Sequence, residues 1–508
     1  MKSHSNSASL FLRVFFVLAL AFSAVAAPVK YVFLFIGDGM AAPQRTMAAD
    51  FAKRVHDYEL LINELPYAVA TTTHAANSLI TDSAASGTAF ACGAKTNNGY
   101  IGVTPDGKPV ESVAYVAQKA GKKVGIITSV TINHATPAAF YAHNLSRNNY
   151  YEIGLDMVAS GFDFFGGGAV GKHNDTKSKR YAGSIYDLAA KAGYTVIVGD
   201  QDKIRALQPG GGKVFAAAQH STMPYAIDAK KDDLTLADIT EKAIELLDNP
   251  KGFFMMVEGG KIDWMCHAND AASVIGEMIS FDQAVRVAYS FAQKHPDDTL
   301  IVVTGDHETG GLTLGFAGAG YQQHLELLGK QAGTIDSFRS LLKDLLAQKW
   351  QSLAEVYTLI DAFFSMKVDG PADDPLTLTA IEKEKIDKSY AREIVQLNGE
   401  RKLAACKDAY EAKKKTTPEA EHAALTKAYK AEEAAIQAAL AAELKAMPGS
   451  ALAIQVLHIF NQKCGVAWNS FNHTALPVTT TAVGKRADEI LAATDNTKIA
   501  EVLKAMLQ

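Results

Sequence analysis

Short, uninterrupted apolar segments recur between residues 31 and 304. They are rich in β-branched and aromatic residues and comprise 31–36, 123–128, 194–199, 253–257 and 299–304. Runs of this kind are typical of strands buried on both faces of a parallel sheet. Amphipathic helical patterns such as 235–247 and 271–293 lie between them. The alternation predicts an α/β fold with a doubly wound, mostly parallel sheet flanked by helices.

Metal-ligand residue types follow directly after three of these strands. Asp38 follows the first, Glu258 the fourth, and the pair Asp306-His307 the fifth. Ligands of doubly wound sheets gather beyond the carboxyl ends of the strands. We therefore expect these side chains to share one site.

The character of the sequence changes after about Tyr321. Residues 336–366 have a helical pattern, and 375–446 are rich in Ala, Lys and Glu, which favour helix. We predict a largely helical insert over 317–460, which divides the main domain into 28–316 and 461–508, with a late strand at 477–483. His422 is expected to be solvated, and the insert to take no part in the chemical step.

The N-terminus has the pattern of a secretory signal peptide over residues 1–26. Lys2 and Arg13 precede the apolar run 15–22, and small residues follow, with cleavage expected after Ala26 or Ala27. The run is short for a bilayer span. We expect a periplasmic or secreted protein with no stable membrane span after cleavage.

The overall charge excludes the basic field typical of nucleic-acid-binding proteins. The 508 residues include 50 Lys and Arg against 55 Asp and Glu, a formal net charge of −5. The four cysteines, at 92, 266, 406 and 464, form no CxxC pair, which argues against a zinc–thiolate site. Export permits disulfides, and a bond between Cys406 and Cys464 stays open.

The most informative segment is 80–88, where Ser83 follows Asp82 and precedes a run of small residues. If a helix begins here, its free N–H groups form an anion site that contains the Ser83 hydroxyl. That hydroxyl is a candidate nucleophile for phosphoryl transfer. Taken alone, the segment is more typical of a simple helix N-cap.

A second pair of candidate metal ligands favours a catalytic role for Ser83 over that of a simple N-cap. Asp263 and His267 are four residues apart, so on a helix they share one face. That spacing suits a zinc ion. Together with the residues that end the strands, the pair indicates a site for several metal ions, which clamp the attacking and leaving oxygens of an in-line displacement.

In combination, these segments resemble the secreted alkaline phosphatase family, from about Lys30 to Gly315 and again near Trp468. The resemblance is carried by 36–40, 81–86, 134–138, 257–267, 305–309 and 473–474. It implies a phosphate monoester hydrolase that releases inorganic phosphate through a phosphoserine on Ser83. It also implies a homodimer and an alkaline phosphatase-like fold with a helical insertion before the last metal ligand.

The resemblance further implies two zinc ions and one magnesium ion. The first zinc would be held by Asp263, His267 and His473. The second, which also activates Ser83, would be held by Asp38, Asp306 and His307. The magnesium would be held by Asp38, Thr136 and Glu258. Arg147 would grip phosphate oxygens through its planar guanidinium, and Asp82 would position Arg147.

Two expected substrate-site residues depart from the best-known bacterial pattern. His134 stands where that branch has an aspartate, and Trp264 stands where it has a lysine near the phosphate. Similar replacements occur in other branches, including some marine bacterial enzymes. Imidazole suits zinc better than magnesium, so the third metal stays open. Loss of the lysine cation is expected to loosen product binding.

Two alternatives remain. The first is a phosphodiesterase or sulfatase on the same superfamily scaffold, which by analogy uses Thr or a modified Cys or Ser as its nucleophile. The second is a non-catalytic metal or phosphate binder. Ser83 with Arg147 and a third metal set favours monoester hydrolysis over both.

Overall fold

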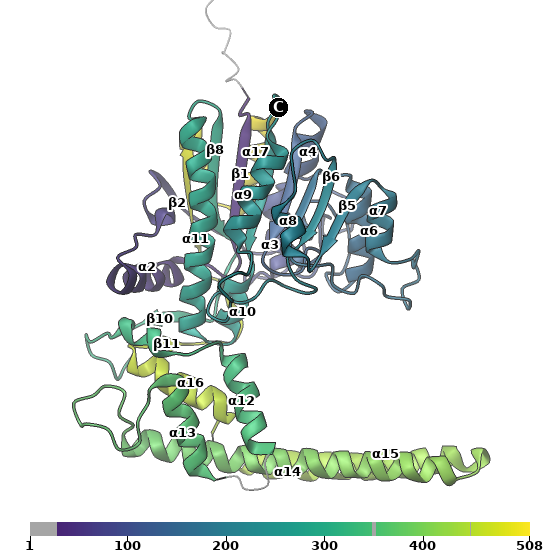
Figure 1. Cartoon of the computed structure of the whole chain (residues 1–508), viewed down its shortest axis with the longest axis vertical. Helices are drawn as coiled ribbons and strands as arrows, with labels where there is room; N and C mark the ends of the chain where they lie inside the picture. Colours follow the sequence, from purple (N-terminus) through teal and green to yellow (C-terminus); the bar gives the residue numbers. More distant parts are fainter. Residues whose placement is uncertain (1–27, 348–351, 448) are drawn as a thin grey trace, which may run out of the picture.

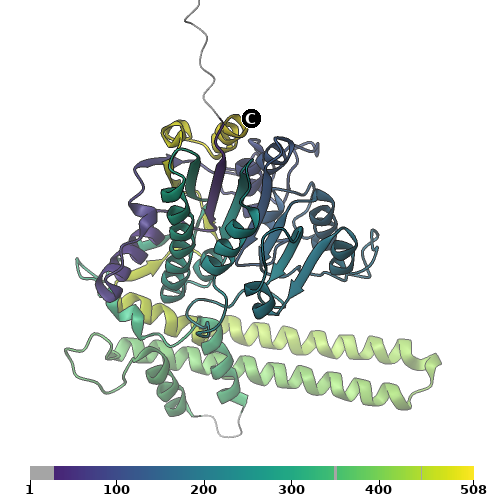
Figure 2. The ribbon, with the colours of Figure 1, turned by 45° about the horizontal axis from the view of Figure 1, so that its top comes forward.

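The computed structural model describes residues 28–347, 352–447 and 449–508. The predicted signal peptide lies outside the described residues. Figures 1 and 2 show an α/β body and, below it, a helical part from which a long two-helix hairpin projects.

The body is built on a nine-stranded sheet in the order β2-β13-β8-β1-β7-β3-β4-β6-β5. Its parallel strands are β1 (Tyr31–Gly37), β3 (Lys123–Thr128), β4 (Phe164–Gly167), β5 (Tyr194–Val198), β6 (Lys213–Ala217), β7 (Phe253–Gly259) and β8 (Thr299–Gly305). The antiparallel edge consists of β13 (Val478–Gly484) and β2 (Tyr67–Thr71). The predicted fold class is confirmed, although β2, β4 and β6 were not predicted from the sequence.

The sheet has a separate hydrophobic core on each face, and β1 contributes alternate residues to both. Phe33 and Phe35 enter one core, whereas Leu34 and Ile36 enter the other. This alternation explains why the strand is apolar throughout. The first face is covered by α2 (Ala42–His56), α9 (Leu236–Leu247) and α11 (Ala271–Lys294). The second is covered by α3 (Ser83–Cys92), α4 (Val113–Lys119), α6 (Tyr150–Ser160), α7 (Ile185–Lys191) and α17 (Asn496–Leu507).

The central strands end level with one another. Gly37, the last residue of β1, is in register with Gly259 of β7 and Gly305 of β8. Thr128, the last residue of β3, pairs with Glu258. The segments that follow these strands therefore start from one edge of the sheet.

The chain enters the helical part and returns to the body through two paired strands. Leu312 of β10 (Leu312–Leu314) pairs with Trp468 of β11 (Val466–Trp468). Between them lie the 3-10 helix η2 (Leu325–Lys330) and the helices α12 (Ile335–Ala347), α13 (Leu353–Phe364), α14 (Ala380–Thr416), α15 (His422–Ala446) and α16 (Leu452–Lys463). The domain boundaries assigned from the sequence stay a prediction.

The projecting hairpin consists of α14 and α15. The Tyr410 ring stacks on Tyr429 at 4.4 Å between centroids, and Gly399 leaves room for Leu440 of the opposite helix. α15 has no buried residue, and its side chains are partly or fully exposed. His422 begins α15, and its ring Nε2 donates to the backbone oxygens of Lys414 and Thr417 at the hairpin tip.

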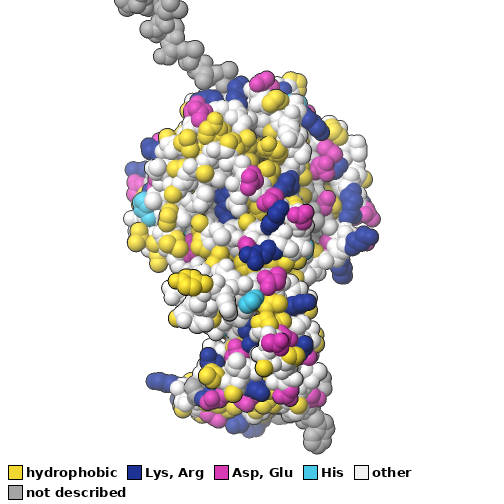
Figure 3. All heavy atoms as spheres, turned by 90° about the vertical axis from the view of Figure 1, so that its left-hand side faces the viewer, with side chains coloured by type: hydrophobic (Ala, Val, Ile, Leu, Met, Phe, Trp, Pro, Cys, Tyr) yellow, Lys and Arg dark blue, Asp and Glu magenta, His cyan; other side chains and the backbone are white. Residues whose placement is uncertain are grey.

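The described residues bear on three further expectations: a disulfide, a membrane span and the surface charge. All four cysteines are free and buried, so Cys406 and Cys464 are not bonded to each other. None of the helices within the described ranges combines the length and the apolar character that crossing a bilayer requires. Figure 3 shows acidic and basic side chains interspersed on one face of the molecule rather than a field of one sign.

Candidate active site

Ser83 is the first residue of α3, and it is almost completely buried. Asp82 is the N-cap of this helix, and its Oδ1 accepts a hydrogen bond from the Ala85 amide at 2.9 Å. The small residues of α3 allow a neighbouring segment to approach closely. A side chain at Gly87 would lie 3.2 Å from the Cα of Thr136, at the start of α5 (Ala135–Ala138).

The Ser83 hydroxyl faces the first group of candidate metal ligands, Asp38, Asp306 and His307. Ser83 Oγ lies 3.2 Å from His307 Nε2. That nitrogen lies 3.3 Å from both Asp38 Oδ1 and Asp306 Oδ2. Both carboxylates follow the level strand ends described above, as the sequence predicted. All three ligand residues are fully buried.

A second group contains Asp263, His307 and His473. His267 lies beside it, with its Nε2 3.3 Å from Asp263 Oδ2 and 3.1 Å from His473 Nε2. The set expected from the sequence is therefore brought together, and His307 adjoins it as well. The Nδ1 atoms of the two outer histidines donate to backbone oxygens, His267 to Phe471 and His473 to Thr81. These bonds leave each Nε2 as the lone-pair nitrogen that faces the group.

A third group consists of Asp38, His134 and Glu258. Thr136 also belongs to this region, since its hydroxyl donates to Asp38 Oδ2 at 3.4 Å. The sequence had assigned His134 to the substrate site, and the structure shows it among candidate ligands as well. Its Nε2 lies 3.4 Å from Arg147 Nη2, so it also adjoins the substrate side.

Several buried polar atoms in these groups have no hydrogen-bond partner. They are Asp38 Oδ1, Asp306 Oδ2, Glu258 Oε1 and His134 Nδ1. Leaving such atoms unpaired in the interior is costly. Carboxylate oxygen and imidazole nitrogen are ligands that zinc and similar divalent cations accept. The unpaired atoms and their chemistry therefore fit bound metal ions.

The pKa shifts of these residues also favour bound metal ions. Burial, reinforced by neighbouring carboxylates, raises the pKa values of Asp38 and Asp306 well above their usual range. Burial also raises the pKa of Glu258 to about 7 and lowers that of His134 to about 3. Burial disfavours the ionised form of Asp263 too, but the three histidines around this carboxylate hold its pKa below its usual range. A cation would relieve the repulsion among the carboxylates, and neutral imidazole is the ligand form of histidine.

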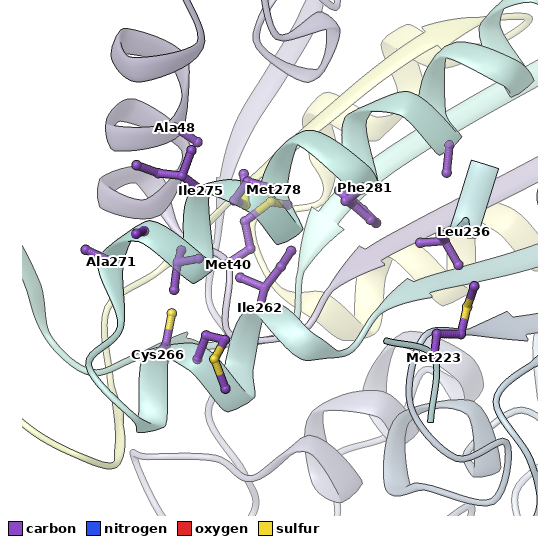
Figure 4. Close-up of a cluster of buried hydrophobic side chains, with 14 of the residues drawn as sticks. Met40, Ala48, Met223, Leu236, Ile262, Cys266, Ala271, Ile275, Met278 and Phe281 are labelled. Atoms are coloured by element: carbon purple, nitrogen blue, oxygen red, sulfur yellow. The ribbon is translucent and has the colours of Figure 1, made fainter. Parts of the chain in front are cut away.

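The short helix α10 (Lys261–His267) holds Asp263 and His267 on one face, as the sequence predicted. Its opposite face is fixed by apolar packing. In Figure 4, Ile262 and Cys266 of α10 lie with Ile275 of α11 and Met40 in a buried cluster. Rigid packing behind a ligand-bearing helix favours a defined ligand geometry.

The turn after β1 approaches α10 very closely at Gly39. This residue has a φ of 76°, and a Cβ there would lie 2.8 Å from the Cα of Asp263. Its amide donates to Asp306 Oδ1 at 3.1 Å. Only glycine meets both demands, and the close approach brings ligands from β1, β8 and α10 together.

Arg147 reaches the same site from the loop before α6. Its Nη1 donates to Asp82 Oδ2 at 3.0 Å, and the Gly99 amide donates to the same oxygen. Asp82 thus caps α3 and holds the guanidinium with one carboxylate. Trp264, the other departure noted in the sequence, lies half-buried, and its ring makes an edge-to-face contact with that of His134 at 6.0 Å between centroids.

Sequence reasoning gave no role to Glu308 or Thr309, which directly follow the Asp306-His307 pair. Glu308 is fully buried and accepts hydrogen bonds from Gln44 Nε2 and from the amides of Gly311 and Leu312. It also accepts a hydrogen bond from Thr474, whose strand β12 (His473–Thr474) pairs with β9 (Glu308–Thr309). Glu308 therefore helps to hold His473 in the site. The only signal in the sequence was its position next to a ligand pair.

Known proteins share this sequence pattern and fold. A family model described as alkaline phosphatase matches residues 29–508. Alkaline phosphatase 4 of Bacillus subtilis is 39% identical over 251 residues, which is 47% of this chain and 51% of that protein. The chain thus spans about half the length of this relative.

Solved structures extend the likeness to nearly the whole chain. The cold-active alkaline phosphatase of a psychrophilic Shewanella species matches with a TM-score of 0.69 and 26% identity, covering 94% of this chain and all of the other. An alkaline phosphatase mutant from the Antarctic bacterium TAB5, with Mg bound in its M3 site, matches with a TM-score of 0.50 and 33% identity. That match covers 57% of this chain and 81% of the other.

Proposed function

The chain belongs to the alkaline phosphatase family, and we propose that it is a metal-dependent phosphate monoester hydrolase that works through a phosphoserine on Ser83. The observation that carries the proposal is the position of the Ser83 hydroxyl. It lies at a helix N-terminus, 3.2 Å from a buried candidate ligand, His307. On the open side stands Arg147, which Asp82 holds in place. A nucleophile, an anion site and metal ligands thus converge.

We assign the metal ligands as the resemblance implies. Asp263, His267 and His473 would hold one zinc. Asp38, Asp306 and His307 would hold a second zinc beside Ser83. Asp38, Thr136 and Glu258, joined by His134, would hold the third ion. When bound, such ions favour the alkoxide of a serine and neutralise charge on phosphate and leaving oxygens.

For the third ion we propose Mg²⁺, which is bound in the M3 site of a TAB5 mutant that has glutamate in place of a histidine. This chain has a histidine, His134, in its third group. The imidazole of His134 also suits Zn²⁺. Elemental analysis of the purified protein distinguishes the two.

Arg147, Asp82 and Ser83 have separate roles in the proposed reaction. The fork of Arg147 binds two phosphate oxygens, and the carboxylate of Asp82 fixes its orientation. Ser83 Oγ attacks phosphorus, so the Oγ–P bond forms while the ester O–P bond breaks and the alcohol leaves. Water then attacks the phosphoserine, which releases inorganic phosphate and restores the hydroxyl. Burial of the ligands behind Ser83 leaves one open side for substrate.

The proposal is tested by metal removal and by substrate class. Chelation should abolish hydrolysis of an aryl phosphate, and zinc should restore most of it, with magnesium adding to the effect. Full activity in protein shown to be metal-free would contradict the proposal. Faster hydrolysis of the methyl diester of the same aryl phosphate would instead favour a phosphodiesterase, and turnover of the aryl sulfate a sulfatase.

We further propose that small phosphate monoesters are the substrates and that the protein is an exported homodimer, in the periplasm or secreted. The predicted signal peptide and the family resemblance support this. N-terminal sequencing of mature protein should begin at Ala27 or Pro28. Sedimentation should give twice the mass of one chain.

A further inference from the structure

Exposed apolar side chains are concentrated on the chain segments that carry residues of the candidate active site. Eleven large hydrophobic residues are exposed among the described residues. Five of them lie within three residues of Asp82, Arg147 or His473 along the chain. These five, which we call the apolar rim, are Leu79, Ile80, Leu145, Phe471 and Leu476. Scattered exposure would not concentrate nearly half of them on three short segments.

Backbone hydrogen bonds tie the rim to site residues in space as well as in sequence. The carbonyl of Phe471 accepts from His267 Nδ1 at 2.5 Å, and Thr81, next to Ile80, accepts from His473 Nδ1 at 2.8 Å. On the other side, Asn98 donates to the Ile80 carbonyl. The following residue, Gly99, accepts from the amide of Arg147, which lies two residues after Leu145. These bonds fix the segments that carry Ile80, Leu145 and Phe471 beside the site.

The solvent-accessible side chains of the site are those that adjoin the rim segments. Ser83 is 1% exposed, and Asp38, Asp306 and His307 behind it are completely buried. The side chain of His267 is 36% exposed and that of Arg147 is 25% exposed. A phosphate group that reaches Ser83 must therefore leave its alcohol part projecting past these two residues, where the rim stands.

One rim residue is also held in place. The Phe471 ring stacks on His458 of α16 at 5.8 Å, with 16° between the ring planes, yet Phe471 remains 47% exposed. His458 is itself fixed by Asn269 at 3.1 Å. A ring that is positioned in this way loses little conformational entropy when an apolar group covers it.

We infer that the apolar rim binds the alcohol part of the substrate and makes the enzyme select phosphate monoesters of aromatic or bulky apolar alcohols over those of polyhydroxyl alcohols. The inference rests on the proposed monoesterase function and assigns its substrate class. Burial of apolar surface supplies the selectivity. Polyhydroxyl alcohols gain nothing from such contacts and lose hydration there.

The test compares benzyl phosphate with glycerol 1-phosphate, which both release a primary alkoxide. The holoenzyme should have a higher kcat/KM for the benzyl ester. Phe471→Ser and Ile80→Ser should each lower the benzyl-to-glycerol ratio about three- to tenfold, mainly through KM. Leu491→Ser is the matched control, because Leu491 is exposed to the same 45% as Ile80 but lies in η4 (Ala487–Ala492), away from the rim. An unchanged ratio in both rim variants, or an equal fall in Leu491→Ser, overturns the inference.

A binding measurement separates this inference from the proposed function. Benzylphosphonate should bind the holoenzyme more tightly than methylphosphonate, and Phe471→Ser should remove most of the difference. If the protein hydrolyses neither ester, the proposed function fails, while the phosphonate preference still reports on the rim. If Phe471→Ser changes the sedimentation coefficient and leaves both preferences intact, the rim is an interface between copies, and the inference is wrong.

Discussion

The hydroxyl of Thr309 donates a hydrogen bond to Asp263 Oδ1 at 2.6 Å. Thr309 Oγ1 also lies 3.2 Å from His307 Nδ1, and it accepts a hydrogen bond from that nitrogen when the nitrogen carries the ring proton. One buried hydroxyl thus connects an aspartate of one candidate metal group with a histidine shared by two. It holds His307 with Nε2 toward Ser83 and the ligands, the arrangement that metal binding requires.

Replacing this hydroxyl should weaken metal binding with little change in shape. We expect Thr309→Val to lower zinc affinity about 10- to 100-fold, and Thr309→Ser to restore most of it. Competition with a chromogenic chelator measures the affinity directly. Thr313→Val, an exposed position on β10, is the control. Wild-type affinity in Thr309→Val would show that the hydroxyl does not position the ligands.

Ser83→Ala should lower monoesterase turnover by about a thousandfold or more, because the group that attacks phosphorus is gone. Metal content should stay at the wild-type stoichiometry, since no carboxylate or imidazole is removed. Acid quenching of the wild type during turnover should trap phosphate on a peptide that contains Ser83, as read by mass spectrometry. Near-wild-type turnover in the variant would rule out the nucleophile assignment.

Arg147→Ala should weaken inhibition by free phosphate about 10- to 100-fold, because a guanidinium makes two charge-assisted bonds to phosphate. Arg147→Lys should recover little, since an ammonium lacks the planar fork. The melting temperature should change little, as it should in the control Arg180→Ala, whose arginine is 58% exposed. If the inhibition constant is unchanged in Arg147→Ala, Arg147 lies outside the phosphate site.

Glu277 of α11 should make stability depend on pH. Burial raises the pKa of its carboxyl from 4.5 to about 7, although the Ala226 amide donates to Oε1 at 2.7 Å. The pKa of Glu277 is thus higher in the folded than in the unfolded protein. The contribution of this carboxyl to the free energy of unfolding is therefore fully present below about pH 4.5 and is lost as the pH rises through about 7. The shift corresponds to about 3 kcal/mol.

Glu277→Gln should remove this dependence. The free energy of unfolding of the variant relative to wild type, measured with urea, should rise between pH 5 and pH 7 and stay level above pH 8. Glu241→Gln, at an exposed position of α9, should give a difference that is flat with pH. A flat difference for Glu277→Gln would mean that the carboxyl is solvated in solution.

The outer part of the hairpin should be dispensable for chemistry. Tyr410 faces Tyr429 and Gly399 faces Leu440, so residues 403 and 436 lie opposite each other. Replacing residues 404–435 with a Gly/Ser linker of about five residues should close the shortened hairpin. Turnover of a small aryl phosphate should be retained, as it should in His422→Ala. A folded, zinc-loaded but inactive deletion variant would mean that the hairpin supplies catalytic groups.

Much of this molecule follows from local patterns. Continuous apolar runs predicted β1, β3, β7 and β8 because strands covered on both faces need apolar residues at every position. β5 has the same kind of run, although it is an edge strand and Thr195 in it is exposed. β4 and β6 are also parallel interior strands, yet β4 is only four residues long and contains two glycines, so it gave no such signal. Candidate ligands such as Asp38 were identified because residues that follow parallel strands gather at one edge of the sheet.

The sequence by itself determined the fold class, the start of α3 at Ser83 and the shared helix face of Asp263 and His267, because each depends on neighbours within a few residues. Only the tertiary structure decided that His307 adjoins two groups of candidate ligands, that Glu308 anchors the strand carrying His473, and that the apolar side chains of the rim are exposed. Those relations join segments that are up to 392 residues apart, as in the bond from His473 to Thr81. Contacts of that range depend on the register of β9 with β12 and on the path of the chain through the helical part, and neither leaves a local periodicity in the sequence.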